Sequence, residues 1–374
     1  MSNNELEVRC FLREGLPNLK WQLQSGKSAV VAFLGGSITE GAYASCPDTG
    51  SWRALIASRL SSAFPDHRID YVNAGVGGTD STFGAFRFRE HAAALGRIDL
   101  LFVEFAVNDC KNRTEAIQGI EAIVRLCRQY YSDSDICFLY SPDRRCLLHP
   151  EVASWHEEVA AHYNLPSVHI TDFIAGEIST GRLQWDEYAS DDVHPTDYGH
   201  GIYAKLLWEF IEYALEETLP HGQRTVPNDS VQPLIYPNAR LVPLSAAESL
   251  QGFVHTRNYR PEPLWNWRYN KEVLHSVKPG DQLLLSFTGS AVGCLLLAGK
   301  DIGLLEYALE DGIWQVSDPY DTWCEQCWRP KPLILYNRLT PGQHTLVLRH
   351  GISERTGLGE NGETSISILK FLIS

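Results

Sequence analysis

Three polar side chains in this sequence have the types that hydrolysis through a side-chain nucleophile requires. Ser37 follows a pair of glycines, and Asp191 precedes His194 by three residues. Such a reaction needs a nucleophile, a base that takes its proton and a group that orients the base. Ser37 is therefore the candidate nucleophile, His194 the candidate base, and Asp191 the carboxylate that holds the imidazole tautomer. The choice of Asp191 over its neighbour Asp192 depends on that three-residue spacing alone.

Two further segments offer hydrogen-bond donors for the negative charge that forms on a substrate carbonyl oxygen. Gly78 lies in the glycine-rich stretch NAGVGGTDS, and Asn108 follows the apolar run IDLLFVEFAV. The backbone N–H groups of Ser37 and Gly78 and the side-chain amide of Asn108 are the predicted oxyanion hole.

Five predicted strands position these residues. The run VVAFL that leads to Ser37 is apolar and begins with β-branched residues, which is typical of a strand buried on both faces. Further strands are expected at 69–73, 99–107, 136–140 and 167–170, with helices between them and a last helix that Pro195 opens. This alternation predicts a three-layer α/β/α, flavodoxin-like domain around a parallel five-stranded sheet. The carboxyl ends of its strands share one edge, so the candidate residues are expected to converge there.

Length, charge and composition narrow the class of protein. A chain of 374 residues favours two domains, and an apolar content of 44% is ample for their cores. The formal net charge of -14 argues against nucleic-acid and anionic-membrane partners. The start MSNNELEVRC does not have the pattern of a signal peptide, and nine cysteines, an odd number, suit reduced thiols, so a cytoplasmic protein is expected. No nucleotide-binding glycine motif is present, and we expect neither a cofactor nor a metal.

The sequence changes character after residue 219. A proline-rich polar segment suggests a linker, and beyond it follow short β-type runs separated by turn pairs such as Pro279-Gly280. We predict a catalytic domain at residues 1–225, a linker at 226–240 and an all-β, jelly-roll-like sandwich at 241–374. Trp323 and Trp328, in a polar loop of this sandwich, are predicted to form an exposed substrate-binding platform, whereas Trp314 is expected in the core.

Other polar residues receive structural interpretations. Glu104 lies in a predicted buried strand and is expected to satisfy a neighbouring donor. Arg87 is expected on a helix surface or in an ion pair, and His350 is expected on the surface. The pair Cys324-x-x-Cys327 has no second pair, so a zinc site is not expected.

Four blocks of the sequence carry a family resemblance: GGSIT (35–39), NAGVGGTDS (73–81), VEFAVND (103–109) and DDVHPTDYGH (191–200). In this order they resemble the signature blocks of the SGNH hydrolases, also called GDSL-type esterases and lipases. The resemblance implies a nucleophile, two further oxyanion donors and a D-x-x-H pair at Ser37, Gly78, Asn108, Asp191 and His194. Gly36 departs from the family pattern, which has an acidic residue before the nucleophile.

An SGNH domain followed by a β-sandwich resembles the two-domain carbohydrate acetyl esterases. The expected function is a serine esterase that removes short acyl groups, above all acetyl, from a carbohydrate through an acyl-enzyme. Two alternatives stay open, a lipase or thioesterase for longer acyl chains and a non-catalytic carbohydrate-binding protein. The expected partner is a small acylated substrate such as an acetylated oligosaccharide, and the sequence leaves a homo-oligomer open.

Overall fold

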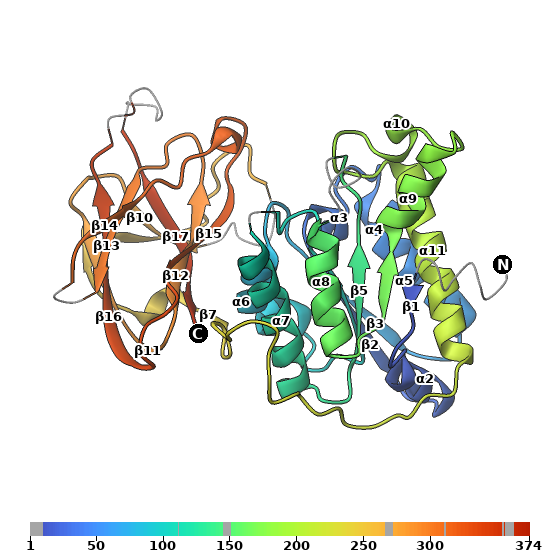
Figure 1. The fold of residues 1–374 in the computed structure, drawn as a ribbon. Helices are drawn as coiled ribbons and strands as arrows, with labels where there is room; N and C mark the ends of the chain where they lie inside the picture. Colours follow the sequence, from blue (N-terminus) through green and yellow to red (C-terminus); the bar gives the residue numbers. More distant parts are fainter. Residues whose placement is uncertain are drawn as a thin grey trace. The chain divides into compact units, whose positions relative to one another are not determined.

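The structure, a computed structural model, describes residues 10–374 apart from 111, 145–150, 266–271, 310–311, 354 and 356–362. The chain divides into two compact units, Met1–Pro237 and Asn238–Ser374, each of which is described by itself (Figure 1). Among the described helices, none combines the length with the apolar character that crossing a membrane requires.

A six-stranded sheet forms the centre of the first unit. Its strand order is β1-β6-β5-β4-β2-β3, in which the last five strands run parallel and β1 pairs antiparallel with β6. The strands are β1 (Cys10–Phe11), β2 (Ala29–Gly35), β3 (Ile69–Gly75), β4 (Leu100–Glu104), β5 (Asp135–Tyr140) and β6 (Ser167–His169). The predicted parallel five-stranded sheet is confirmed. The edge strand β1 escapes sequence analysis because two residues carry no periodicity.

Helices cover both faces of this sheet (Figure 1). They are α2 (Pro17–Gln24), α3 (Ser37–Glu40), α4 (Pro47–Gly50), α5 (Trp52–Ala63), α6 (Ser81–Arg87), α7 (Arg113–Tyr130), α8 (Glu151–His162), α9 (Ile170–Ser179), α10 (Trp185–Tyr188) and α11 (Asp197–Glu216). One turn of π-helix, Phe88–Ala92, continues α6. Buried side chains of α2, α5, α9 and α11 share one core cluster with Val31, Phe33 and Phe102 of the sheet. The helices α6, α7 and α8 lie on the other face, which makes the three layers.

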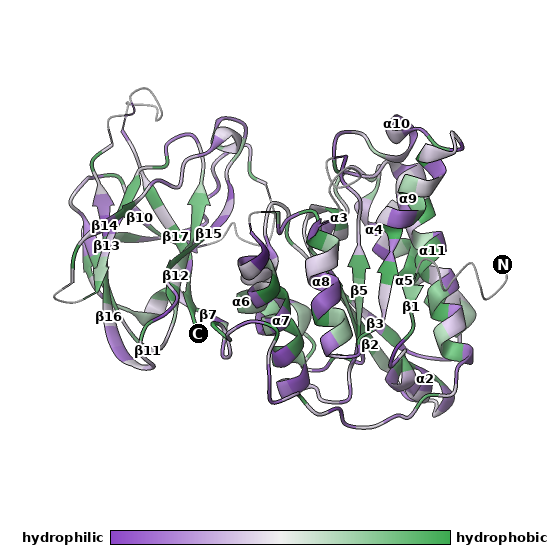
Figure 2. Ribbon diagram, in the orientation of Figure 1, coloured by the Kyte–Doolittle hydropathy of each residue, from purple (hydrophilic) through white to green (hydrophobic). Residues whose placement is uncertain are grey.

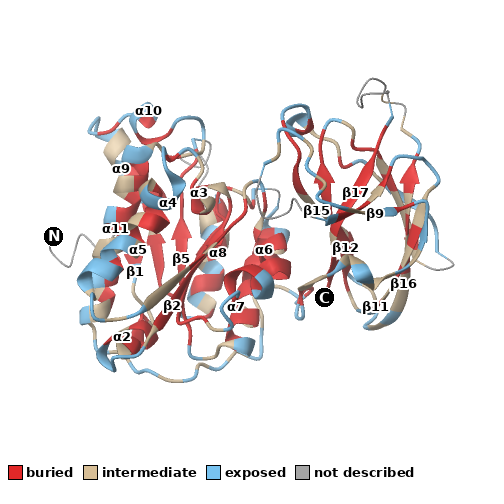
Figure 3. Ribbon diagram, turned by 180° about the vertical axis from the view of Figure 1, so that it is seen from behind, coloured by how far each residue is buried: buried red, intermediate tan, exposed pale blue. Residues whose placement is uncertain are grey.

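The colouring of the helices agrees with this packing. Many of them carry hydrophobic and hydrophilic residues on different sides (Figure 2), and the sides toward the sheet are buried (Figure 3). All seven residues of β2 are buried, as its apolar sequence predicts. β2 is therefore a rigid support for the residue that follows it.

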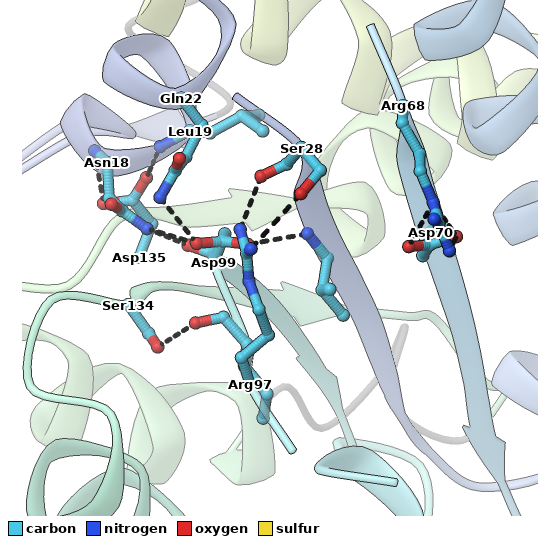
Figure 4. A network of polar contacts seen from close by, with 12 residues as sticks. Asn18, Leu19, Gln22, Ser28, Arg68, Asp70, Arg97, Asp99, Ser134 and Asp135 are labelled. Carbon is cyan, nitrogen blue, oxygen red and sulfur yellow. Dashed lines mark hydrogen bonds and ion pairs between the residues drawn. The ribbon is translucent and has the colours of Figure 1, made fainter. Parts of the chain in front are cut away.

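Two buried carboxylates attach α2 to the amino ends of β4 and β5 (Figure 4). Asp135 accepts hydrogen bonds from the backbone N–H groups of Asn18 at 3.2 Å and Leu19 at 2.8 Å. Asp99 accepts a hydrogen bond from the Gln22 side chain at 2.9 Å. Burial raises the pKa of Asp135 to about 7, although its hydrogen-bond donors oppose this. These polar contacts lie at the amino ends of the strands. The candidate site lies at the opposite edge of the sheet, where the strands end.

The segment expected to act as a linker packs on the first unit over most of its length. The backbone N–H groups of Val231 and Gln232 donate to the Glu121 carboxylate at 2.9 and 3.2 Å. Ile235 and Tyr236 are buried. A composition rich in proline and polar residues thus predicts an irregular segment, but it does not predict whether that segment packs against a neighbouring domain.

The second unit consists of antiparallel strands in two sheets. Their orders are β15-β12-β17-β10-β9, with β7 also pairing with β17, and β14-β13-β16-β11-β8. The strands are β7 (Arg240–Val242), β8 (Ala247–Gln251), β9 (Val254–Arg257), β10 (Glu272–Ser276), β11 (Gln282–Gly289), β12 (Val292–Ala298), β13 (Leu304–Leu309), β14 (Gln315–Ser317), β15 (Arg329–Tyr336), β16 (Gly342–Gly351) and β17 (Ile366–Ile373). One apolar cluster takes residues from both sheets, for example Leu296 and Leu348. The predicted all-β region is confirmed.

Candidate active site

Ser37 is the first residue of α3 and directly follows the turn that ends β2. That turn is too crowded for side chains. A Cβ added at Gly35 would lie 2.6 Å from the backbone oxygen of Glu104, and one added at Gly36 would lie 2.2 Å from Asn108 Oδ1. A side chain at position 36 would therefore have to displace the Asn108 side chain, which occupies this space.

Ser37, His194 and Asp191 form one chain of hydrogen bonds. The distance from Ser37 Oγ to His194 Nε2 is 2.8 Å, and that from His194 Nδ1 to Asp191 Oδ2 is also 2.8 Å. Asp191 Oδ1 accepts hydrogen bonds from the backbone N–H groups of Val193 at 2.8 Å and His194 at 2.7 Å. Partial burial alone would raise the pKa of Asp191, but these bonds hold it below its ordinary value. Asp191 is thus kept ionised beside the imidazole.

The neighbouring Asp192 points to another partner. Its carboxylate lies 3.7 Å from the Arg144 guanidinium, and its backbone oxygen accepts a hydrogen bond from Arg144 N at 2.8 Å. The structure therefore brings Asp191, and not Asp192, to the imidazole.

The loop that carries Asp191 and His194 is closed on itself. Ala189 and Pro195 form an isolated antiparallel bridge, and Ser190 N donates to the backbone oxygen of His194 at 2.9 Å. The Trp185 indole N–H donates to the backbone oxygen of Asp191 at 2.8 Å. The loop then enters α11, whose first turn is capped by the Thr196 hydroxyl.

The two predicted oxyanion donors outside α3 lie in turns that adjoin Ser37. Gly78 has a left-handed backbone, φ +70°, in the turn after β3. Its neighbour Gly77 donates its N–H to Glu40 Oε2 at 2.7 Å, and a Cβ at Gly77 would lie 3.5 Å from Ser37 Cβ. Asn108, after β4, lies against Gly36 on the other side. The structure thus gathers all five candidate residues at one edge of the sheet.

A buried pair that sequence analysis did not identify fixes the Asn108 turn. Asp109 Oδ1 accepts a hydrogen bond from Ser81 N at 2.9 Å, and Asp109 Oδ2 lies 2.8 Å from His156 Nε2. The side chains of Asp109 and His156 are both 2% exposed. Asp109 lies within the block VEFAVND, but His156 stands alone on a helix and has no signal in the sequence.

Glu104 lies beneath the nucleophile turn, and its expected structural role is confirmed. Its Oε2 accepts a hydrogen bond from the Thr39 hydroxyl at 2.9 Å, and its backbone oxygen accepts one from Gly36 N at 3.3 Å. Complete burial raises the pKa of Glu104 to about 7, against the opposing effect of the Thr39 hydrogen bond.

The predicted aromatic platform of the second unit needs a correction. Trp323 is 43% exposed, but Trp328 is only 9% exposed and lies against Gly299. Its indole N–H donates to Asp301 Oδ1 at 3.1 Å, so the prediction of an exposed ring was wrong for Trp328. The residue that accompanies Trp323 is Trp265, which is 42% exposed and stacks on it with ring centroids 5.2 Å apart.

The expectation for Trp314 was also wrong. This side chain is 39% exposed, and the Arg349 guanidinium lies 3.9 Å from its ring centroid. Trp314 therefore packs against a guanidinium at the surface and does not lie in the apolar core that was expected.

Metal-ligand types do not gather in the described part of the chain, where groups of three or more His, Cys, Asp and Glu residues in a metal-binding arrangement are not found. Cys324 and Cys327 are free and buried.

Known proteins share sequence features and fold with this chain. Residues 33–202 match the GDSL-like Lipase/Acylhydrolase family, whereas no curated protein sequence matches at a significant level. A two-domain esterase active on acetylated mannans, co-crystallised with mannopentaose, is 21% identical, with 99% of this chain and 98% of that chain covered and a TM-score of 0.83. Another structure of such an esterase gives the same values.

A catalytic mutant of an acetylxylan esterase from Geobacillus stearothermophilus is 18% identical, with 49% of this chain and 94% of that chain covered and a TM-score of 0.41. The two-domain esterase thus shares its fold with almost the whole chain. Residues 33–202 match a GDSL-like lipase/acylhydrolase domain, and this match together with the fold shared over almost the whole chain supports a carboxylic ester hydrolase.

Proposed function

We propose that this protein is a serine esterase that removes short acyl groups, above all acetyl, from carbohydrate. The observation that carries the proposal is the continuous hydrogen-bonded chain from Ser37 Oγ through the His194 imidazole to the Asp191 carboxylate, with 2.8 Å at both steps. This geometry suits a hydroxyl whose proton passes to an adjacent base while a carboxylate holds the base in the required tautomer.

In the proposed first step, Ser37 Oγ attacks the carbonyl carbon of the ester and His194 Nε2 takes the hydroxyl proton. The charge that develops on the carbonyl oxygen is bound by the N–H groups of Ser37 and Gly78 and by the Asn108 amide. When the tetrahedral intermediate collapses, the C–O bond to the sugar breaks, and His194 returns the proton to the leaving oxygen. Asp191 stabilises the imidazolium during both transfers.

The second step releases the acyl group. Water enters where the sugar has left, His194 takes one of its protons, and the resulting hydroxide attacks the acyl carbon of the ester on Ser37. Collapse of the second intermediate returns the proton to Ser37 Oγ and gives a carboxylic acid. The reaction is balanced by water alone.

Two observations support an acylated carbohydrate as the substrate. The esterase that shares the fold over 99% of this chain is active on acetylated mannans. In the second unit, the exposed pair Trp265 and Trp323 offers flat indole faces of the kind that pack on the apolar faces of sugar rings. A catalytic first domain and a sugar-binding second domain are part of this proposal.

The proposal is tested by rates on two series of substrates. The first contains acetyl, butyryl and octanoyl esters of one chromogenic phenol, and the second contains acetylated manno-, xylo- and cello-oligosaccharides with acetate release as the readout. We expect acetyl to exceed octanoyl in kcat/KM, and acetylated sugars to exceed the simple acetyl ester. Faster hydrolysis of octanoyl esters would instead favour the lipase or thioesterase. Sugar binding without hydrolysis would identify a non-catalytic carbohydrate-binding protein.

A further inference from the structure

The imidazole of His194 has a third neighbour besides Ser37 and Asp191. The Tyr43 ring lies parallel to it, with centroids 4.8 Å apart and an interplanar angle of 9°. Tyr43 is 54% exposed, so burial of its ring in the core does not explain where it sits. One face of the His194 imidazole is thus covered by an aromatic ring from the loop that follows the nucleophile.

The backbone of Tyr43 takes a conformation that a tyrosine rarely adopts. Its φ is +64°, in the left-handed region where a Cβ is crowded by the backbone. Such residues persist only where the surroundings determine the conformation, and they cluster at functional sites. Tyr43 lies in the loop Gly41–Cys46, which follows α3.

Each end of this loop is tied to an element of the site. The N–H groups of Gly41 and Ala42 both donate to the backbone oxygen of Ser37 at 3.0 Å. On the far side, Ser45 N donates to Asp197 Oδ1 at 2.8 Å, and the Ser45 hydroxyl donates to Asp197 Oδ2. Because Asp197 stands three residues after His194, the loop joins the nucleophile segment to the base segment, with Tyr43 between these two attachments.

A buried histidine adds a further contact to the middle of the loop. His200 Nε2 lies 3.3 Å from the backbone oxygen of Ala42, and Trp52 N donates to His200 Nδ1 at 3.3 Å. Burial lowers the pKa of His200, which keeps its imidazole neutral and able to accept the Trp52 N–H. His200 then donates its remaining ring proton to Ala42, and the residue before Tyr43 is fixed.

We propose that Tyr43 is a positioning residue for the base His194 and that it stabilises the imidazolium formed during catalysis. This inference rests on the proposed function, in which His194 takes the proton of Ser37. Asp191 binds Nδ1 and restrains the imidazole within the plane of its ring. The Tyr43 ring lies against the face of the imidazole. Rotation of the imidazole about the Cβ–Cγ bond of His194 would therefore break the stacking contact.

The stacked ring also discriminates between the two charge states of the imidazole. An aromatic face attracts a cation through the negative centre of its π system, while its contact with a neutral ring lacks that attraction. In the proposed reaction, the imidazolium forms when Nε2 takes a proton from Ser37 or from water. Tyr43 therefore contributes more in the transition state than in the ground state, which is an effect on kcat.

The ring itself, and not the phenol hydroxyl, carries this role. Tyr43→Phe is expected to keep the kcat of the natural protein on a chromogenic acetyl ester, and Tyr43→Leu to lower kcat by about two- to fivefold or more with KM little changed. Tyr198→Leu is the matched control, since Tyr198 is 62% exposed on the first turn of α11 and its loss is expected to leave kcat unchanged. Asp197→Ala, which releases the loop without removing the ring, should lower kcat in the same direction.

A spectroscopic readout separates this inference from the proposed function. In protein with 13C-labelled histidine, the stacked ring current should shift the His194 ring protons upfield. This shift is expected to persist in Tyr43→Phe and Ser37→Ala and to vanish in Tyr43→Leu. Unchanged His194 resonances or an unchanged kcat in Tyr43→Leu would overturn the positioning role while the esterase stands. Loss of kcat in Tyr43→Phe equal to that in Tyr43→Leu would also overturn it, whereas full activity of Ser37→Ala would reject the proposed function itself.

Discussion

His156 and Asp109 form a buried pair next to the turn that carries Asn108, with Nε2 2.8 Å from Oδ2 and both side chains 2% exposed. The pair joins α8 to the turn that presents Asn108. Its second oxygen, Oδ1, binds the N–H of Ser81 at the start of α6. The position of the Asn108 amide therefore depends on two helices of the opposite layer.

Replacing His156 by Leu should lower both stability and kcat. The change leaves the buried Asp109 carboxylate without its imidazole partner, which we expect to cost about 1–3 kcal/mol in the free energy of unfolding. Since the Asn108 turn loses a constraint, kcat should fall with KM little changed. Urea unfolding and steady-state kinetics on a chromogenic acetyl ester measure the two effects. A destabilised variant with the full kcat at low temperature would restrict the pair to a structural role.

Removal of the Asn108 amide should affect the transition state more than substrate binding. If the amide donates to the oxyanion, Asn108→Ala lowers kcat by about 10²–10³ with KM nearly constant. A rise in KM alone would instead show a ground-state contact. Gly36→Ala offers a second route to the same group, because its Cβ would lie 2.2 Å from Asn108 Oδ1 and must displace the side chain. It should reproduce the loss of kcat while Asn108 is still present.

The five parallel strands and their helices were predictable because their signals are local. Buried β-branched runs, glycine turns and the helix spacing between them are read directly from neighbouring residues. The convergence of Ser37 and His194, 157 positions apart, then follows from the topology of a parallel sheet. The crowding between Gly36 and Asn108 could not be predicted in this way, since it depends on how closely two turns approach each other.

The sequence does not predict which polar side chains are buried. Arg87, expected on a surface or in an ion pair, is fully buried and donates to the backbone oxygens of Ala74 and of Gly35, the latter at 2.7 Å. His350, also expected on the surface, is buried between the hydroxyls of Ser276 and Thr364, and burial lowers its pKa to about 4. Each of these residues is satisfied by partners from distant segments, which no window of neighbouring residues contains.

The proposed triad should behave as one unit. Ser37→Ala and His194→Ala are each expected to lower kcat by several orders of magnitude, and the double variant to be little worse than either alone, because neither residue can act without the other. Both side chains lie at the edge of the sheet and outside the core, so unfolding curves should stay close to that of the natural protein. Multiplying losses in the double variant would contradict a shared step.

The tryptophans of the second unit should separate into two classes. Trp265→Ala and Trp323→Ala are expected to raise KM on an acetylated oligosaccharide and to spare a small chromogenic acetate, because only remote binding is lost. Trp328→Ala, which empties a buried site beside Gly299, should instead destabilise the protein by about 3–5 kcal/mol. If Trp265→Ala and Trp323→Ala both keep the KM of the natural protein on the sugar, the proposed sugar binding by these rings is rejected, and the proposed esterase activity is unaffected.

Glu104→Gln should change how stability depends on pH. Burial raises the pKa of Glu104 from 4.5 to about 7, so the folded protein holds a proton that the unfolded chain has already released between these values. A raised carboxyl pKa stabilises the protein fully below about pH 4.5, and this contribution is lost as the pH rises toward 7. Over that window the natural protein should lose about 3 kcal/mol relative to the Gln variant, which cannot ionise.

Urea unfolding of both proteins between pH 4.5 and pH 8 measures this difference, with the pH range set by the ordinary and raised values for Glu104. Other groups that titrate in the same window, such as Asp135 with its pKa of about 7, are common to both proteins and cancel in the comparison. Parallel stability curves would mean that Glu104 ionises at its ordinary pH despite burial. A difference that opens as the pH rises places a protonated carboxyl beneath the Gly36 turn in acid and a charged one at neutral pH.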